Sequence, residues 1–81
     1  MPIEFAVYAI SDQDRAKIEK AFTYHAPKDD QPQKYAALRE NGKALAMAMA
    51  RSCPPSRELS LALTNLEQAI MWANAAIARN E

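Results

Sequence analysis

Hydrophobic residues in the last third of the chain recur at alternating spacings of four and three. This spacing places them along one stripe of an α-helix. The stripe starts after Pro54-Pro55-Ser56, where the Ser56 hydroxyl can cap a first turn, and no Gly or Pro interrupts it afterwards. The sequence therefore predicts a long helix over residues 56–80, with an apolar stripe formed by Leu59, Leu63, Leu66, Ile70, Ala73 and Ile77.

Further apolar residues of the same segment lie off this stripe, namely Ala62, Ala69, Trp72 and Ala76. A helix that is apolar on more than one side needs more than one packing partner. A single domain of 81 residues buries only about 60–65% of its unfolded surface, so its own core is marginal. We therefore expect other subunits to provide some of the partners, and we expect an oligomer.

A second apolar stripe precedes the prolines and predicts a helix over residues 31–52. Its members are Tyr35, Leu38, Gly42, Leu45 and Met49. Asp30 and Gln33 have the spacing of an acidic capping box at its start. Gly42 is the single glycine of the chain, and in mid-helix it costs about 1 kcal/mol relative to Ala. We expect this glycine to mark a close approach by another backbone or by a ligand.

The first 30 residues predict a short helix between less regular segments. Residues 1–10 are read as an N-terminal arm that packs on a neighbour. Ser11 caps a helix over residues 11–22, and a loop over residues 23–30 follows, because Pro27 disfavours helix at the residue before it. Two long helices joined by a short connection become antiparallel neighbours. The predicted fold is all-α: a short N-terminal helix and a long antiparallel helical hairpin, together one domain over residues 11–81.

Charge and composition restrict the class of partner. Ten basic and ten acidic residues cancel, which argues against a DNA- or RNA-polymer-binding protein but leaves room for a small anionic ligand. No apolar run reaches the roughly 20 residues of a membrane span. Glu4 and the absence of an early cationic segment argue against a secretory signal, so a cytoplasmic protein is expected. One His and one Cys provide no structural zinc site, no cofactor is expected, and Cys53 is read as a small buried residue.

No catalytic motif occurs, so we do not expect an enzyme. The loop after the first helix does combine groups that suit a planar base and a phosphate. Tyr24 can stack on the base, Lys28 can supply charge, and Thr23 and His25 can donate hydrogen bonds. The structural alternative has equal weight: Phe22 and Tyr24 would anchor the loop on the hairpin, and His25 would satisfy a backbone carbonyl.

Four residues of the predicted helices are further candidates for ligand contacts. Arg39 and Lys43 share one helix face at a spacing of four, although a solvated face is the more usual explanation of such a pair. Arg57 is unfavourable in the first turn of a helix unless an anion binds there. Asn74 lies in an apolar stretch, where a buried amide requires partners, so it is expected at a subunit interface or at a ligand.

Two segments resemble a known family. FTYHAPKDDQPQKYAALRENGKALA and CPPSRELSLALTNLEQAIMWANAAIARNE are similar to phage anti-CBASS cyclic-dinucleotide sponges, whose helical hairpin is shared with the anti-Thoeris sponge. The resemblance covers residues 22–81. It implies that the protein sequesters cyclic dinucleotides such as 3′,3′-cGAMP without turnover, with cyclic trinucleotides as candidates for separate sites. It also implies a homohexamer whose pockets lie between protomers.

The resemblance further implies that an aromatic residue stacks on the base and that basic residues hold the phosphates. Tyr24 and Lys28 match the loop motif, and Arg39 and Arg57 lie in the similar segments. Two other functions stay open: a sponge for a cyclic ADP-ribose isomer, and an oligomeric helical adaptor that binds protein through its apolar faces.

Overall fold

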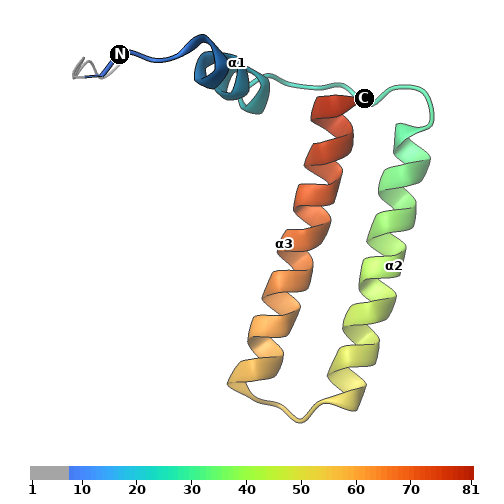
Figure 1. The fold of residues 1–81 in the computed structure, drawn as a ribbon. Coiled ribbons are helices and arrows are strands. Elements are labelled where there is room, and N and C mark those ends of the chain that lie inside the picture. The colour runs from blue at the N-terminus through green and yellow to red at the C-terminus, as the bar shows by residue number, and fades with distance from the viewer. Residues whose placement is uncertain (1–7) are drawn as a thin grey trace.

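Two long antiparallel helices dominate the computed structural model, which describes residues 8–81. Helix α2 spans Gln31–Ser52 and helix α3 spans Arg57–Asn80, and the two lie side by side as a hairpin (Figure 1). Helix α1 spans Asp12–Ala21 and projects away from the open end of the hairpin. No strand occurs within residues 8–81. The predicted all-helical class and the hairpin are confirmed, whereas the predicted arm lies mostly outside the described residues.

Serine side chains cap two of the three helices. The Ser11 hydroxyl accepts a hydrogen bond from the backbone of Asp14, and the Ser56 hydroxyl accepts one from the backbone of Leu59, each at 3.1 Å. The predicted cap at Asp30 is wrong, because that side chain makes no capping hydrogen bond. Asp30 has φ −90° and ψ 6° instead of the extended conformation of a capping residue. It completes the turn that leads into α2.

The contact between α2 and α3 follows the predicted stripes closely on α3 and less closely on α2. All six residues of the α3 stripe are half-buried. On α2, Leu45 was expected in the stripe but is 51% exposed, and the half-buried Ala46 lies against α3 instead. Residues 44–50 are all apolar, so helical periodicity alone did not distinguish the contacting face from its neighbour.

Gly42 marks a close approach of the two helices, but its neighbour is a side chain. A Cβ atom at this position would lie 3.0 Å from Cγ1 and 3.1 Å from Cδ1 of Ile70. Both distances are shorter than the 3.5–4.0 Å at which carbon atoms attract most strongly. The missing Cβ therefore lets Ile70 sit directly against the backbone of α2.

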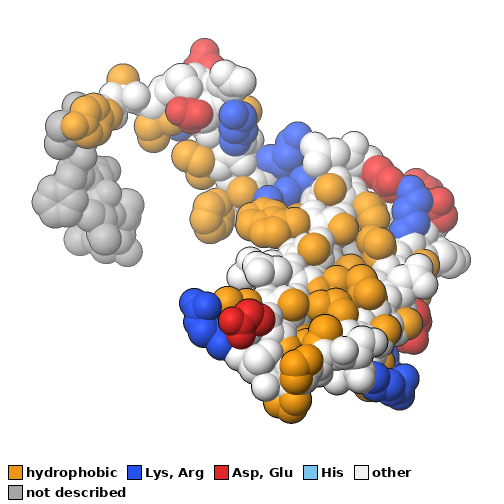
Figure 2. Space-filling view, turned by 60° about the horizontal axis from the view of Figure 1, so that its bottom comes forward, with side chains coloured by type: hydrophobic (Ala, Val, Ile, Leu, Met, Phe, Trp, Pro, Cys, Tyr) orange, Lys and Arg blue, Asp and Glu red, His pale blue; other side chains and the backbone are white. Residues whose placement is uncertain are grey.

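The single chain has no closed hydrophobic core within residues 8–81. None of their hydrophobic side chains is buried, and Trp72 is 66% exposed. The chain exposes 7013 Å², whereas a compact monomer of 9.0 kDa exposes about 4,900 Å². Hydrophobic side chains gather over the hairpin, with charged side chains near the edges (Figure 2). The hairpin thus presents apolar faces that nothing within these residues covers.

Cys53 is exposed, so the prediction of a buried cysteine is wrong. It follows the last residue of α2 in the short connection to α3, where no third layer of structure covers it. No helix within the described residues has both the length and the apolar composition to cross a membrane.

Candidate functional site

The loop between α1 and α2 is fixed at its beginning by its own polar side chains. The Thr23 hydroxyl donates to the carbonyl of Glu19. Nε2 of His25 lies 3.0 Å from the carbonyl of Lys20, and it donates there in the tautomer that carries the Nε2 proton. The last carbonyls of a helix have no partner within the helix. Thr23 and His25 therefore cap the C-terminus of α1, as the structural alternative for His25 proposed.

The end of the loop is fixed to α2 by Gln31. The backbone N–H of Gln31 donates to the carbonyl of Lys28 at 2.9 Å, and its side-chain Oε1 accepts the backbone N–H of Lys28 at 3.1 Å. Asp29, inside this turn, has φ 53°, a left-handed conformation that Asp tolerates better than most residues. Both the backbone N–H and the carbonyl of Lys28 are therefore hydrogen-bonded to Gln31 where the loop enters α2.

The same residues connect the loop to the end of α3. The Nε2 of Gln31 donates to Oε1 of Glu81 at 3.3 Å, and the Lys34 ammonium forms an ion pair with the other carboxylate oxygen of Glu81. The hydrogen bond from Lys34 is the main cause that lowers the pKa of Glu81 below its ordinary value. The same hydrogen bond raises the pKa of Lys34. These contacts join the start of α2 to the end of α3 at the open end of the hairpin.

A groove of about 420 Å³ lies where the loop meets the hairpin. Tyr24 stands at this groove and is 84% exposed, so its ring can stack on a planar ligand. Phe22 is 88% exposed, so it does not anchor the loop on this chain. We call this surface the loop groove; it is lined by Tyr24, His25, Pro27, Tyr35, Asn74, Ala75 and Ala78.

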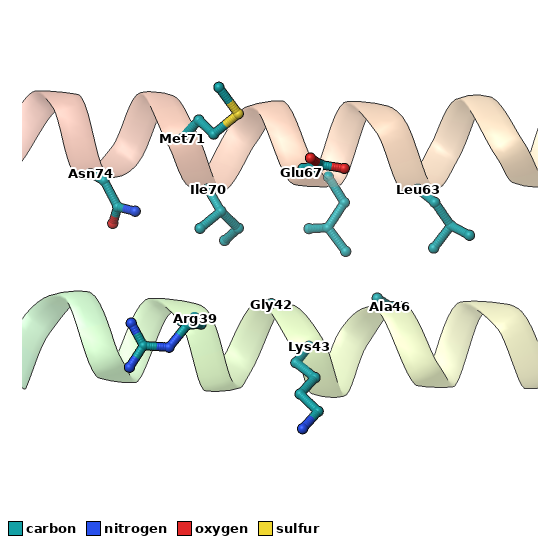
Figure 3. A pocket seen from close by; sticks show the side chains of 10 residues that line it. Arg39, Gly42, Lys43, Ala46, Leu63, Glu67, Ile70, Met71 and Asn74 are labelled. Carbon is teal, nitrogen blue, oxygen red and sulfur yellow. The ribbon is translucent and has the colours of Figure 1, made fainter.

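A second groove, of about 440 Å³, runs between α2 and α3. We call it the interhelix groove, and Figure 3 shows most of its lining. Ile70 and Asn74 point toward α2, whereas Met71 points away from it. Arg39 and Lys43 line the α2 side and form no ion pair within residues 8–81. The two cations are therefore available to an anion in this part of the chain.

Asn74 belongs to both grooves. Its Oδ1 is buried and has no hydrogen-bond partner among the described residues. A buried amide oxygen without a partner costs about 1–3 kcal/mol, and such groups are rare in folded proteins. The position therefore calls for a donor from a ligand or from another subunit, as the sequence indicated.

The predicted site residues thus fall into separate places on one chain. The loop groove holds Tyr24 and His25 with Asn74, and the interhelix groove holds the two α2 cations with the same Asn74. Lys28 lines neither groove. Arg57 starts α3 and lies at the closed end of the hairpin, where the short connection joins α2 to α3, far from the loop (Figure 1). An Arg57 can share a site with Tyr24 only if it comes from a second subunit whose closed end lies at the loop of the first.

A family model for the Acb2/Tad1 hairpin domain matches residues 14–78. The chain belongs to the Acb2/Tad1 hairpin family. This is the family of the anti-CBASS and anti-Thoeris sponges, so the resemblance found in the sequence is confirmed. Comparisons with curated proteins and with solved structures find no match. Members of the Acb2/Tad1 hairpin family are cyclic nucleotide sponge domains, which bind a ligand and are not known as catalysts.

The structure also adds residues that the sequence did not single out for the site. Tyr35 was read as part of a packing stripe, yet it lines the loop groove together with Ala75 and Ala78. Gln31 and Glu81 fix the loop although they are 50 residues apart. No periodicity in the sequence marks such a pair.

Proposed function

We propose that this chain is a sponge that binds a cyclic dinucleotide such as 3′,3′-cGAMP in the cytoplasm of an infected host and releases it unchanged. The observation that carries the proposal is the loop groove. It combines an exposed tyrosine ring with a buried, unpartnered amide oxygen in a chain of the cyclic nucleotide sponge family. Stacking on Tyr24 suits the base, and the Asn74 oxygen can accept a hydrogen bond from a base N–H once its side chain turns into the groove.

The size of the groove supports a site shared between subunits. About 420 Å³ lies toward the lower end of the range for small-molecule pockets, which suits one half of a dinucleotide. A twofold interface presents the same surface from both subunits. Two loop grooves facing each other would therefore hold the two bases, with the phosphates between them and within reach of cations such as Lys28. We propose such pockets within a homohexamer, with cyclic trinucleotides at separate sites.

The proposed contacts are strong enough for a sponge. Stacking contributes about 1–3 kcal/mol per base, and hydrogen bonds to charged groups contribute about 1.5–3 kcal/mol each. Two stacked bases and three such hydrogen bonds sum to about 6.5–15 kcal/mol. The upper part of this range reaches the roughly 12 kcal/mol that a nanomolar dissociation constant requires, provided that the loop is ordered before binding. The contacts at both ends of the loop supply that order.

A thermal melt with a ligand panel tests the proposal. The panel contains 3′,3′-cGAMP, a cyclic trinucleotide and a cyclic ADP-ribose isomer. At 100 times the dissociation constant the bound ligand adds about 2.7 kcal/mol, which raises the Tm by about 10 °C or more for a domain of this size. A response to the ADP-ribose isomer alone reassigns the sponge to the anti-Thoeris ligand. A Tm that no nucleotide shifts contradicts the sponge and favours the adaptor.

Tyr24 provides the matched variants for the same assay. Tyr24→Ala removes the stacking surface from both subunits of a pocket and should weaken dinucleotide binding about 30-fold or more, whereas Tyr24→Phe keeps the ring and should bind nearly as well. Because Tyr24 is exposed, neither variant should change the mass of the oligomer in light scattering. Unchanged binding by Tyr24→Ala would remove the ring from the site.

A further inference from the structure

Gln31 is the one buried residue within residues 8–81, with 3% of its surface exposed. Burying a polar side chain in a chain without a closed core is unfavourable unless its groups find partners. Both ends of the Gln31 amide have one: Oε1 accepts from the backbone of Lys28, and Nε2 donates to Glu81. Gln31 therefore joins the loop, the start of α2 and the end of α3.

The position of Glu81 indicates that this arrangement has a role beyond helix stability. A carboxylate at the C-terminal end of a helix is unfavourable next to the negative end of the helix dipole. Both oxygens of the Glu81 carboxylate have partners on α2, namely Gln31 and Lys34. The carboxylate thus orients the Gln31 amide, so that its oxygen points to the loop and its NH₂ group points to α3.

We propose that Gln31 is a positioning residue for the proposed ligand loop and acts through Lys28. The Gln31 backbone N–H donates one hydrogen bond to Lys28, and the Gln31 side-chain oxygen accepts another; together they fix the backbone from which the Lys28 side chain extends. A cation that is already in place loses less conformational freedom when it binds a phosphate. This inference rests on the proposed function, because its consequence for binding requires an anionic ligand at the loop.

An exchange of the two side chains tests the role with unchanged net charge. Gln31→Glu places two carboxylates against each other, and the double variant Gln31→Glu/Glu81→Gln restores one donor and one acceptor. The repulsion turns the new carboxylate away from Glu81 and from the Lys28 backbone, so that the hydrogen bond to Lys28 is lost. We expect the single variant to bind 3′,3′-cGAMP about tenfold more weakly in calorimetry. We expect the double variant to return to within about twofold of the unmodified protein.

Two controls separate positioning from a general loss of stability. In a Lys28→Ala background, Gln31→Glu should weaken binding by less than about twofold, because the residue through which it acts is gone. Met49→Ala shortens a half-buried side chain near the far end of α2, so it should lower the Tm and leave the affinity unchanged. The inference would be overturned if Gln31→Glu lowered the affinity equally with and without Lys28, or if Met49→Ala lowered the affinity as much as Gln31→Glu does.

Amide hydrogen exchange tests the hydrogen bonds without any ligand. The Lys28 amide should be protected from exchange in the unmodified protein. Gln31→Met removes both polar groups of the side chain at similar volume, so the Lys28 amide should exchange about tenfold faster in that variant. Protection should return in the double variant Gln31→Glu/Glu81→Gln. Unchanged exchange in Gln31→Met would overturn the inference regardless of binding. An unmodified protein that binds no nucleotide would refute the proposed function and the binding role with it, and faster exchange in Gln31→Met would then show that the hydrogen bonds themselves exist.

Discussion

The contact between Gly42 and Ile70 makes a prediction about the free energy of unfolding. Gly42→Ala gains about 1 kcal/mol from helix propensity. The new Cβ would lie 3.0 and 3.1 Å from two carbon atoms of Ile70, and overpacking of this kind costs about 1–3 kcal/mol. Ile70 lines the interhelix groove, so its side chain can shift and keep the cost near the lower limit. We expect the two effects nearly to cancel, with a net change within about 0.5 kcal/mol.

A double-mutant cycle isolates the contact. Ile70→Ala removes both crowding atoms, so Gly42→Ala in that background should show its full gain of about 1 kcal/mol. The coupling energy should therefore be about 1 kcal/mol. The measurement is guanidinium unfolding at one fixed protein concentration, because oligomer stability depends on concentration.

The matched control is Asn41→Ala, a gain in helix propensity at an exposed neighbour of Gly42. Its effect should be the same with and without Ile70. If Gly42→Ala stabilises the protein by about 1 kcal/mol in both backgrounds, the helices do not approach closely at this glycine, and the described packing of the hairpin is wrong there.

Three further predictions concern stability and assembly. Lowering the pH from about 5 to about 3 should lower the Tm, because the pKa of Glu81 lies below its ordinary value in the folded state and the stability from its contact with Lys34 is lost as that carboxylate gains a proton. Glu81→Gln should reduce the dependence of the Tm on pH, and an equal dependence in both proteins would contradict this prediction. Ser56→Ala should cost about 1 kcal/mol, whereas Asp30→Ala should cost less than about 0.5 kcal/mol because its side chain makes no cap; equal losses would mean that both residues cap. Trp72→Glu should lower the mass in light scattering, because a charge on the exposed apolar face opposes association, and an unchanged mass would place the interface elsewhere.

Patterns that repeat along the chain predicted the hairpin well. The stripe on α3 is half-buried throughout. It was predictable because most of the large aliphatic side chains of α3 follow one unbroken spacing of four and three, so that periodicity identifies one face. On α2 the apolar run over residues 44–50 fits two faces, and the choice between Leu45 and Ala46 depends on where α3 lies. Serine caps were predictable because they act within one turn. The cap at Asp30 failed because a turn through Gln31 takes its place.

The candidate site was predictable only where local chemistry defines it. Tyr24 follows from the loop composition, and the orphan oxygen of Asn74 follows from an amide in an apolar stretch. The connection between Gln31 and Glu81 bridges 50 residues and depends on how the hairpin closes. Arg57 was proposed as a ligand contact from helix-end electrostatics and from its place in a segment similar to the family, but the length of α3 separates it from the loop on one chain.

Recovery of the ligand after binding tests the central claim most directly. The protein is loaded with 3′,3′-cGAMP, freed of unbound nucleotide, denatured by heat, and the released nucleotide is identified by mass spectrometry. A sponge returns intact 3′,3′-cGAMP in a fixed ratio to protomers, and Tyr24→Ala returns far less. Linear or hydrolysed nucleotide would identify an enzyme, and no retained nucleotide would contradict sequestration of this ligand.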